Sequence, residues 1–153
     1  MTVLLLAVLI GIVAGLRAML APAAVSWACA LGWIDVSGTA LSWLAIGWVP
    51  WLFTLAALAE LVGDKLPTTP SRKRAGPFAA RLVSGALCGW ALVATTGMAP
   101  AGAVAGLAGG AIGTLGGAAL RARLAGALGR DWPAALIEDA LAVAGALAIV
   151  SAV

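Results

Sequence analysis

Four carboxylates stand inside stretches of apolar sequence that are long enough to cross a lipid bilayer: Glu60, Asp64, Glu138 and Asp139. An ionisable side chain at the centre of a membrane helix costs about 2.5–3.5 kcal/mol on insertion scales, so it is usually paired, turned toward a bundle interior or part of an ion path. Glu60 and Asp64 are four residues apart and share one face of a helix. The spacing therefore predicts a group of acids that binds a cation or a proton, without specifying which metal, if any.

Basic residues near the ends of the same stretches are the expected partners of these acids. They are Lys65, Arg81, Arg121, Arg123 and Arg17. Two interpretations remain open, because the ion pairs could simply hold helix ends together, or the acids could form a cation or proton site or anchor a polar head group. For Arg17, the alternatives are a side chain that reaches back to the outer interface and an ion pair with Asp35 in the loop that follows.

The composition places the chain in the class of membrane proteins. Of its 153 residues, 63% are apolar and only 10% are charged, whereas soluble domains carry about 25% charged residues. No polar tract of domain size interrupts the sequence, so residues 1–153 are expected to form a single transmembrane domain. The chain has no His, which excludes Ser-His-Asp catalysis and imidazole metal ligands. We expect no enzymatic activity and no cofactor.

Five apolar stretches predict an all-α fold of five transmembrane helices, because a spanning helix needs about 20 mostly apolar residues. The expected helices cover approximately residues 2–21, 45–66, 78–96, 101–121 and 132–153. No charged residue occurs between Leu82 and Leu120, and a single helix of that length would span roughly twice the hydrocarbon core, so the chain is expected to turn at Thr95–Pro100. Residues 23–33 are expected to form an interfacial helix or, alternatively, a re-entrant half-helix.

The distribution of Lys and Arg predicts how these helices are oriented. The loop between the second and third helices and the loop between the fourth and fifth are flanked by basic residues, and the other two loops contain none. The positive-inside rule therefore predicts a multi-pass protein of the bacterial cytoplasmic membrane with a cytoplasmic N-terminus and an external C-terminus. An aromatic belt at the outer interface agrees with this orientation; its members are Trp27, Trp33, Trp43, Trp48 and Trp51.

A basic run in the second-to-third loop consists of Arg72, Lys73 and Arg74. We expect it to rest on anionic lipid head groups at the cytoplasmic face, where each Lys or Arg near the surface contributes about 1 kcal/mol. The alternative is a phosphate site, because hydroxyl groups and Arg suit phosphate oxygens. The expected partners are thus the bilayer and a second copy of the chain, and no nucleic acid.

Glycines recur at three- and four-residue spacing in the expected fourth helix, between Gly102 and Gly117. Such a face lets helix backbones approach closely and predicts a glycine-rich packed bundle and a homo-oligomer; the alternative is that the face lines a narrow pore. A short internal similarity relates the Gly-Leu-Arg at 15–17 to the Ala-Leu-Arg at 119–121. Because the first and fourth helices would run antiparallel, this similarity suggests a weak inverted repeat of the kind found in transporters.

Several motifs resemble a known family. The runs Glu60–Arg72, Arg81–Leu87 and Glu138–Ala140, together with the Gly-Leu-Arg at 15–17, are similar to those of small bacterial membrane proteins catalogued as domain of unknown function 4126. The resemblance covers nearly the whole chain, and the run through 60–72 is its most specific part. It implies a multi-pass membrane protein and supplies no activity.

The first functional hypothesis is a small transporter or channel whose cation or proton meets the four acids near the cytoplasmic side. The second is an accessory or scaffold subunit of a membrane complex, with purely structural ion pairs. A third is an enzyme that acts on a lipid phosphate with carboxylate-held Mg²⁺, which suits the acids chemically although no motif favours it. The sequence leaves the transported or bound molecule open.

Overall fold

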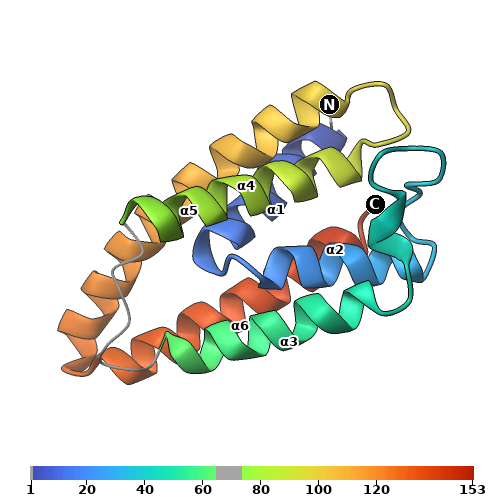
Figure 1. The fold of residues 1–153 in the computed structure, drawn as a ribbon. Coiled ribbons are helices and arrows are strands. Elements are labelled where there is room, and N and C mark those ends of the chain that lie inside the picture. The colour runs from blue at the N-terminus through green and yellow to red at the C-terminus, as the bar shows by residue number, and fades with distance from the viewer. Residues whose placement is uncertain (1, 65–73) are drawn as a thin grey trace.

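A computed structural model of the protein describes residues 2–64 and 74–153 (Figure 1). Its elements are the helices α1 (Thr2–Leu16), α2 (Leu20–Ala30), α3 (Val49–Gly63), α4 (Ala75–Leu92), α5 (Ala99–Leu128) and α6 (Asp131–Val150), with a short 3₁₀ helix, η1 (Ser42–Ala45). The described residues form no strand, and the all-α class is confirmed. The chain turns between α4 and α5, close to the expected Thr95–Pro100.

The first apolar stretch forms two helices rather than one. α1 ends at Leu16, the chain turns at residues 17–19, and α2 runs back toward the end of the molecule where α1 began, which corrects the expected helix over 2–21 (Figure 1). Pro22 is the third residue of α2, and the first N–H groups of a helix have no partner within it, so the missing N–H of Pro22 costs no hydrogen bond there. Inside one continuous helix, Pro22 would remove a backbone hydrogen bond. Most residues of α2 are buried against the other helices, whereas Ala30 to Trp33 at the end of the expected segment 23–33 are exposed; its interfacial and re-entrant alternatives stay predictions.

α5 packs against α1 and α4 through glycines. A Cβ at Gly106 would overlap the carbonyl oxygen of Gly85 in α4, and a Cβ at Gly11 in α1 would overlap that of Gly106. Gly113 likewise leaves no room for a Cβ against Ile12 of α1. These contacts lie within one chain and fill the glycine face with backbone, so this face packs helices and does not line a pore. The expected homo-oligomer stays a prediction, and its subunits would have to contact each other through a surface other than this glycine face.

Two helices, α5 and α6, are long and apolar enough to cross a membrane, whereas α1, α2 and α3 are apolar but shorter. Five membrane spans are therefore not confirmed. α5 also runs past its expected end at residue 121 to Leu128, and it stops before Gly129, whose φ of +67° is left-handed. Arg121 of this helix donates hydrogen bonds to both carboxylate oxygens of Asp131 at the start of α6, at 3.0 and 2.6 Å.

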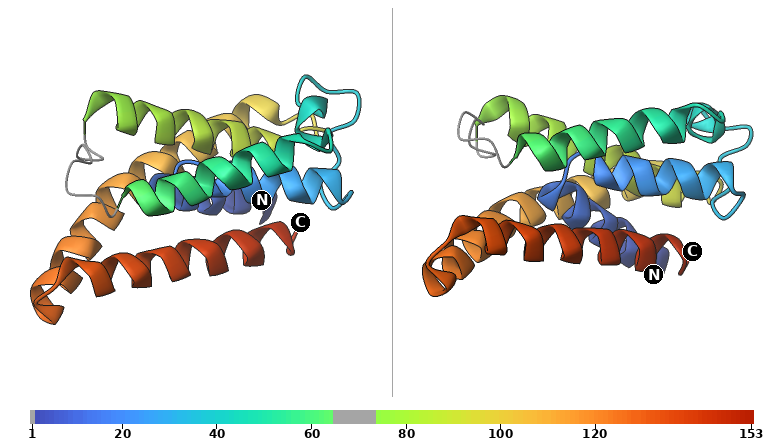
Figure 2. Two further views of the ribbon diagram at one scale, coloured as in Figure 1. Left: turned by 60° about the horizontal axis from the view of Figure 1, so that its bottom comes forward. Right: turned by 90° about the horizontal axis from the view of Figure 1, so that it is seen from below.

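The two termini lie at the same end of the molecule (Figures 1 and 2). The segment between α2 and α3 is also at this end, and the turn from α5 to α6 is at the other. This arrangement does not support a cytoplasmic N-terminus with an external C-terminus. The physical reason is the turn at residues 17–19, because α1 and α2 together reverse the chain once more than a single helix would.

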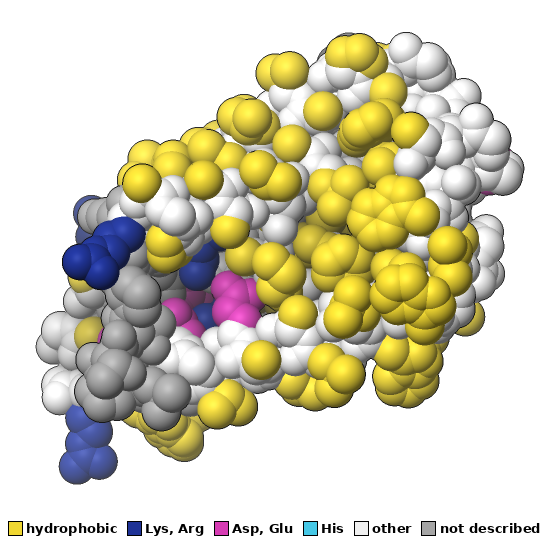
Figure 3. Space-filling model, in the orientation of Figure 1, with side chains coloured by type: hydrophobic (Ala, Val, Ile, Leu, Met, Phe, Trp, Pro, Cys, Tyr) yellow, Lys and Arg dark blue, Asp and Glu magenta, His cyan; other side chains and the backbone are white. Residues whose placement is uncertain are grey.

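Large apolar side chains cover much of the outer surface (Figure 3). Leu55 of α3 is 65% exposed, Val104 of α5 is 68% exposed, and Leu147 of α6 is 59% exposed. Soluble monomers rarely expose wide apolar patches. The surface therefore agrees with the membrane class that the composition indicates.

Candidate functional site

Arg17, in the turn between α1 and α2, is fully buried and holds two acids from distant helices. Its Nη1 lies 2.7 Å from Asp64 Oδ2 at the end of α3, and its Nε donates to Asp139 Oδ1 of α6 at 2.8 Å. The Nη1 and Nη2 atoms of Arg17 form ion pairs with these two carboxylates, but their N–H bonds do not point at the oxygens as a hydrogen bond requires. Arg17 therefore neither reaches the outer interface nor pairs with Asp35, which corrects both expectations for this residue.

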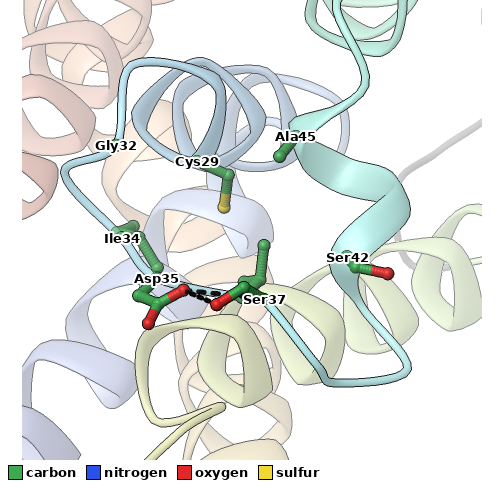
Figure 4. A pocket seen from close by; sticks show the side chains of 8 residues that line it. Cys29, Gly32, Ile34, Asp35, Ser37, Ser42 and Ala45 are labelled. Carbon is green, nitrogen blue, oxygen red and sulfur yellow. Dashed lines mark hydrogen bonds between the residues drawn. The ribbon is translucent and has the colours of Figure 1, made fainter.

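Asp35 lies at a separate pocket of about 330 Å³, formed by the segment that follows α2 (Figure 4). Its Oδ1 accepts hydrogen bonds from the N–H and the hydroxyl of Ser37, at 2.9 and 2.6 Å, and these bonds lower the pKa of the Asp35 carboxyl. The free and buried Cys29 also lines this pocket. The described residues that line it include no base, so the pocket is not part of the ionic cluster around Arg17.

Arg81 of α4 caps the C-terminal end of α1. Its Nη1 donates hydrogen bonds to the carbonyl oxygens of Gly15 and Leu16, both at 2.8 Å. The last carbonyls of a helix have no partner within it and carry the negative end of the helix dipole, so a cation is favourable here. The hydroxyl of Thr114 lies 3.3 Å from the same Gly15 carbonyl. Thr114 was not predicted as part of the site. The sequence feature that could have indicated it is that Thr114 has the only hydroxyl side chain in α5.

Glu60 of α3 caps the N-terminal end of α2. Its two carboxylate oxygens accept hydrogen bonds from the N–H groups of Ala18 and Met19, at 2.9 and 2.8 Å. A helix N-terminus presents free N–H groups and the positive end of the dipole, both of which favour an anion. Glu60 Oε1 also lies 3.4 Å from Arg81 Nη2. The residue that caps α2 and the residue that caps α1 therefore form an ion pair with each other. This capping role was not predicted, because the break itself was not.

Arg121 of α5 forms the second half of the cluster. Its Nη1 lies 2.8 Å from Asp64 Oδ2 and 3.6 Å from Glu138 Oε2, and its Nη2 lies 2.6 Å from Asp131 Oδ2. The same oxygen of Asp64 thus contacts Arg17 and Arg121 and links the two arginines. Asp131 was not predicted as a member. An acid in the first turn of a helix is the sequence signal that could have shown it.

The cluster is partly accessible. The side chains of Asp64 and Asp139 are 14% and 13% exposed, whereas that of Arg17 is not exposed at all and that of Glu138 is 3% exposed. Figure 3 shows a hollow in the surface, in which acidic and basic side chains are visible. Water and protons can therefore reach carboxylates of the cluster, while the guanidinium that joins Asp64 to Asp139 stays buried.

The four predicted acids are bridged by arginines and are not gathered around a cation position. Each of them lies within 3.6 Å of a guanidinium nitrogen. In the part of the chain that the structure describes, no group of three or more His, Cys, Asp or Glu could hold a metal ion. Divalent cations take several oxygen ligands at once, whereas a proton needs a single carboxylate. The four acids therefore lie in ion pairs with arginines of the described residues.

The other predicted bases lie outside this cluster. Arg123 and Arg74 are exposed, and neither belongs to the ion pairs described above. Lys65, Arg72 and Lys73 are outside the described residues, and the predicted contact of the basic run with lipid head groups rests on the sequence alone.

Comparison with known proteins identifies the family. Neither a curated protein nor a solved structure matches the chain. A family described as Domain of unknown function (DUF4126) matches residues 4–152, and this match confirms the resemblance in the motifs around Glu60, Arg81 and Glu138. The chain therefore belongs to the DUF4126 family.

Proposed function

We propose that the protein is an integral membrane protein in which α1 and α2 enter the membrane together as a re-entrant hairpin. α1 has 15 residues and is about 22 Å long, which is less than the roughly 30 Å of the hydrocarbon core. The turn at residues 17–19 then lies within the membrane, where irregular backbone is tolerated only if other groups satisfy it. Arg81 and Glu60 satisfy the carbonyl and N–H groups of the break.

The basic end of the molecule faces the cytoplasm in this proposal. The end of the molecule opposite the termini is basic: Arg74 directly precedes α4, Arg123 lies near the end of α5, and Arg130 directly precedes α6. The positive-inside rule places such an end in the cytoplasm of a bacterial cell, where it also meets anionic head groups. Both termini are then external, and the ionic cluster lies toward the cytoplasmic side of the membrane.

Proton-linked transport is the function that this geometry supports best. The observation that carries it is the fully buried Arg17, which two partly exposed acids, Asp64 and Asp139, share. A proton that adds to the Asp139 carboxylate neutralises it and removes its attraction for the guanidinium. Arg17 then keeps its ion pair with Asp64, and the polar contact that ties α6 to the α1–α2 break is weakened while the packing of α6 remains. When the proton leaves, the contact forms again, so proton binding selects between two arrangements of α6.

The break between α1 and α2 supports the same function. Secondary transporters commonly place their sites where two half-helices meet near the middle of the membrane, with charged groups at the helix ends. Here Arg17 lies between the two half-helices, with Glu60 and Arg81 at their ends. The proton itself is the species that we propose to cross the membrane, because Asp64 and Asp139 are the partly exposed groups at this break.

Proton flux into proteoliposomes that contain a trapped pH-sensitive dye tests the proposal. Wild-type protein should dissipate an imposed pH gradient, and Asp139→Asn should abolish the flux because it removes the titratable group and keeps the side chain's shape. Asp35→Asn is the matched control, since it changes an exposed acid outside the cluster, and it should leave the flux unchanged. Wild-type vesicles that hold the gradient as well as empty vesicles, with a membrane potential applied in either direction, would refute proton transport.

A scaffold subunit with structural ion pairs is the second candidate, because every predicted acid lies close to an arginine. This alternative predicts no flux by the wild type and a loss of stability in Asp139→Asn, since the buried Arg17 guanidinium keeps only one of its two acids. Transport predicts flux by the wild type and a folded Asp139→Asn variant. Measuring flux and thermal unfolding on the same two proteins separates the candidates.

A further inference from the structure

Asp64 and Asp139 share the buried guanidinium of Arg17, and this sharing limits how many protons the two acids can take. Arg17 Nη1 lies 2.7 Å from Asp64 Oδ2, and Arg17 Nε donates to Asp139 Oδ1 at 2.8 Å. A buried cation that loses all its anionic partners is strongly destabilised. One of the two carboxylates therefore stays ionised while the other binds a proton from water.

Arg121 of α5 makes the two acids unequal. Its Nη1 lies 2.8 Å from Asp64 Oδ2, which is the same oxygen that contacts Arg17. Two guanidinium groups, one from the α1–α2 turn and one from α5, thus meet at a single carboxylate oxygen. An opposite charge within about 4–6 Å favours the charged form of a carboxyl group. The contact with Arg121 therefore adds to the stabilisation of ionised Asp64.

Asp131, at the start of α6, fixes the position of Arg121. The Nε and Nη2 of Arg121 donate to the two carboxylate oxygens of Asp131, at 3.0 and 2.6 Å. Pairing through two parallel hydrogen bonds sets the orientation of the guanidinium plane. The Asp131 side chain is 63% exposed, whereas that of Arg121 is 15% exposed. An acid at the surface thereby holds a mostly buried cation against Asp64.

The other charged groups of the cluster also lie close to arginines. Glu60 of α3 pairs with Arg81 of α4 at 3.4 Å, and Glu138 Oε2 of α6 lies 3.6 Å from Arg121 Nη1. The helices α1 and α2 carry no charged side chain. Lys65 is outside the described residues. Arg121 is therefore a cation that several acids share, and its position decides how its charge is divided among them.

We propose that Arg121, positioned by Asp131, keeps Asp64 ionised and thereby directs the proton to Asp139. The inference rests on the proposed function, because it assigns separate roles to the two acids of the same site. Asp64 is the permanent counter-ion of Arg17, and Asp139 is the acid whose charge changes. The polar contact of Arg17 with α6 consequently responds to the proton, whereas its contact with Asp64 persists.

Carbon-13 NMR of protein labelled at the aspartate side-chain carboxyl carbon tests this assignment in lipid bilayers. The chain has only four aspartates, so four signals are expected: those of Asp35, Asp64, Asp131 and Asp139. Each signal shifts when its carboxylate is protonated. Replacing one Asp by Glu at a time removes one signal, keeps a carboxyl group at that position and identifies the residue.

In the wild type, half-protonation of Asp64 should require a proton concentration at least about tenfold higher than half-protonation of Asp139. In Arg121→Gln, the two signals should shift over the same pH range, because neither acid is then favoured by the second guanidinium. Arg121→Lys keeps the charge and should preserve most of the separation. Arg123→Gln is the matched control on the same helix, at an exposed position outside the described ion pairs, and should leave the separation unchanged.

Asp131→Asn is the test variant that keeps both arginines and changes an exposed side chain, so it avoids loss of the fold. It should reduce the separation without abolishing it, because Arg121 remains but loses the partner that orients it. A folded Asp131→Asn variant with the full wild-type separation would contradict the positioning role.

Two further results would overturn the proposal: simultaneous protonation of Asp64 and Asp139 in the wild type, or an equal change in Arg121→Gln and Arg123→Gln. Proton flux, measured on the same proteins in vesicles, is a separate result. Protonation of Asp139 before Asp64 without any flux would leave the roles of the two acids standing while the proposed transport fails. Flux in a wild type that protonates Asp64 first would refute the roles and leave transport standing.

Discussion

The Nε of Arg17 donates a hydrogen bond to Asp139 Oδ1 across 2.8 Å, and this contact joins two residues that are 122 positions apart in the sequence. The same guanidinium contacts Asp64 at the end of α3. The turn between α1 and α2 is thereby tied to α3 and α6 through one buried charge. The Arg17 guanidinium consequently connects three elements that are far apart in the sequence.

Replacing Arg17 by Met should destabilise the protein by about 3–5 kcal/mol, because removing one partner of a buried ion pair leaves its acids desolvated. Thermal unfolding in detergent, followed by tryptophan fluorescence, measures the change. Arg123→Met is the control, since Arg123 is exposed, and it should change stability by less than about 0.5 kcal/mol. Equal effects of the two substitutions would contradict a structural role for the Arg17 ion pairs.

Two glycines of α5 should respond to alanine in opposite directions. Gly106→Ala should destabilise by about 1–3 kcal/mol, because the added Cβ overlaps the Gly85 carbonyl oxygen and forces α4 and α5 apart. Gly116→Ala should stabilise by up to about 1 kcal/mol, because nothing lies near its Cβ and alanine favours the helix. Unfolding temperatures of the two variants check both signs, and a stable Gly106→Ala variant would argue against the close packing of these helices.

Removing the cap of α2 should loosen the turn at residues 17–19. Glu60→Ala leaves the N–H groups of Ala18 and Met19 without their acceptor, at a cost of about 1–2 kcal/mol, a typical value for a lost helix cap. Hydrogen exchange measured by mass spectrometry should be faster in peptides that contain these amides. Glu60→Gln keeps one side-chain oxygen as acceptor and should preserve part of the protection. Unchanged exchange in both variants would show that Glu60 does not hold the break.

The two termini should be on the same, external side of the membrane. Single cysteines at Thr2, Val153 and Gly126 can be placed in a variant that lacks Cys29 and Cys88, since all three positions are exposed. An impermeant thiol reagent added to intact cells should label positions 2 and 153, and label position 126 only after the cells are opened. Labelling of only one terminus in intact cells would restore the odd number of crossings that the sequence predicted.

The sequence by itself determined the all-α class and the family. Long apolar stretches predict helices because a helix satisfies its own backbone groups locally, and that class is confirmed. The motifs around Glu60, Arg81 and Glu138 identified the family, which the match over residues 4–152 confirms. Pairing of the acids with bases was also expected, because charges in apolar surroundings need partners. Proton transport remains a prediction.

Only the tertiary structure decided where the first apolar stretch breaks and which charges meet there. Residues 2–21 have the length and the apolar character of one spanning helix, so nothing local predicts a turn at 17–19. The groups that stabilise this turn are distant in sequence: Glu60 is 41 positions from Met19, and Arg81 is 66 positions from Gly15. A break in a helix is stable only where such partners satisfy its free N–H and carbonyl groups, and packing alone brings them there. The same packing places both termini at one end and buries Arg17 between Asp64 and Asp139.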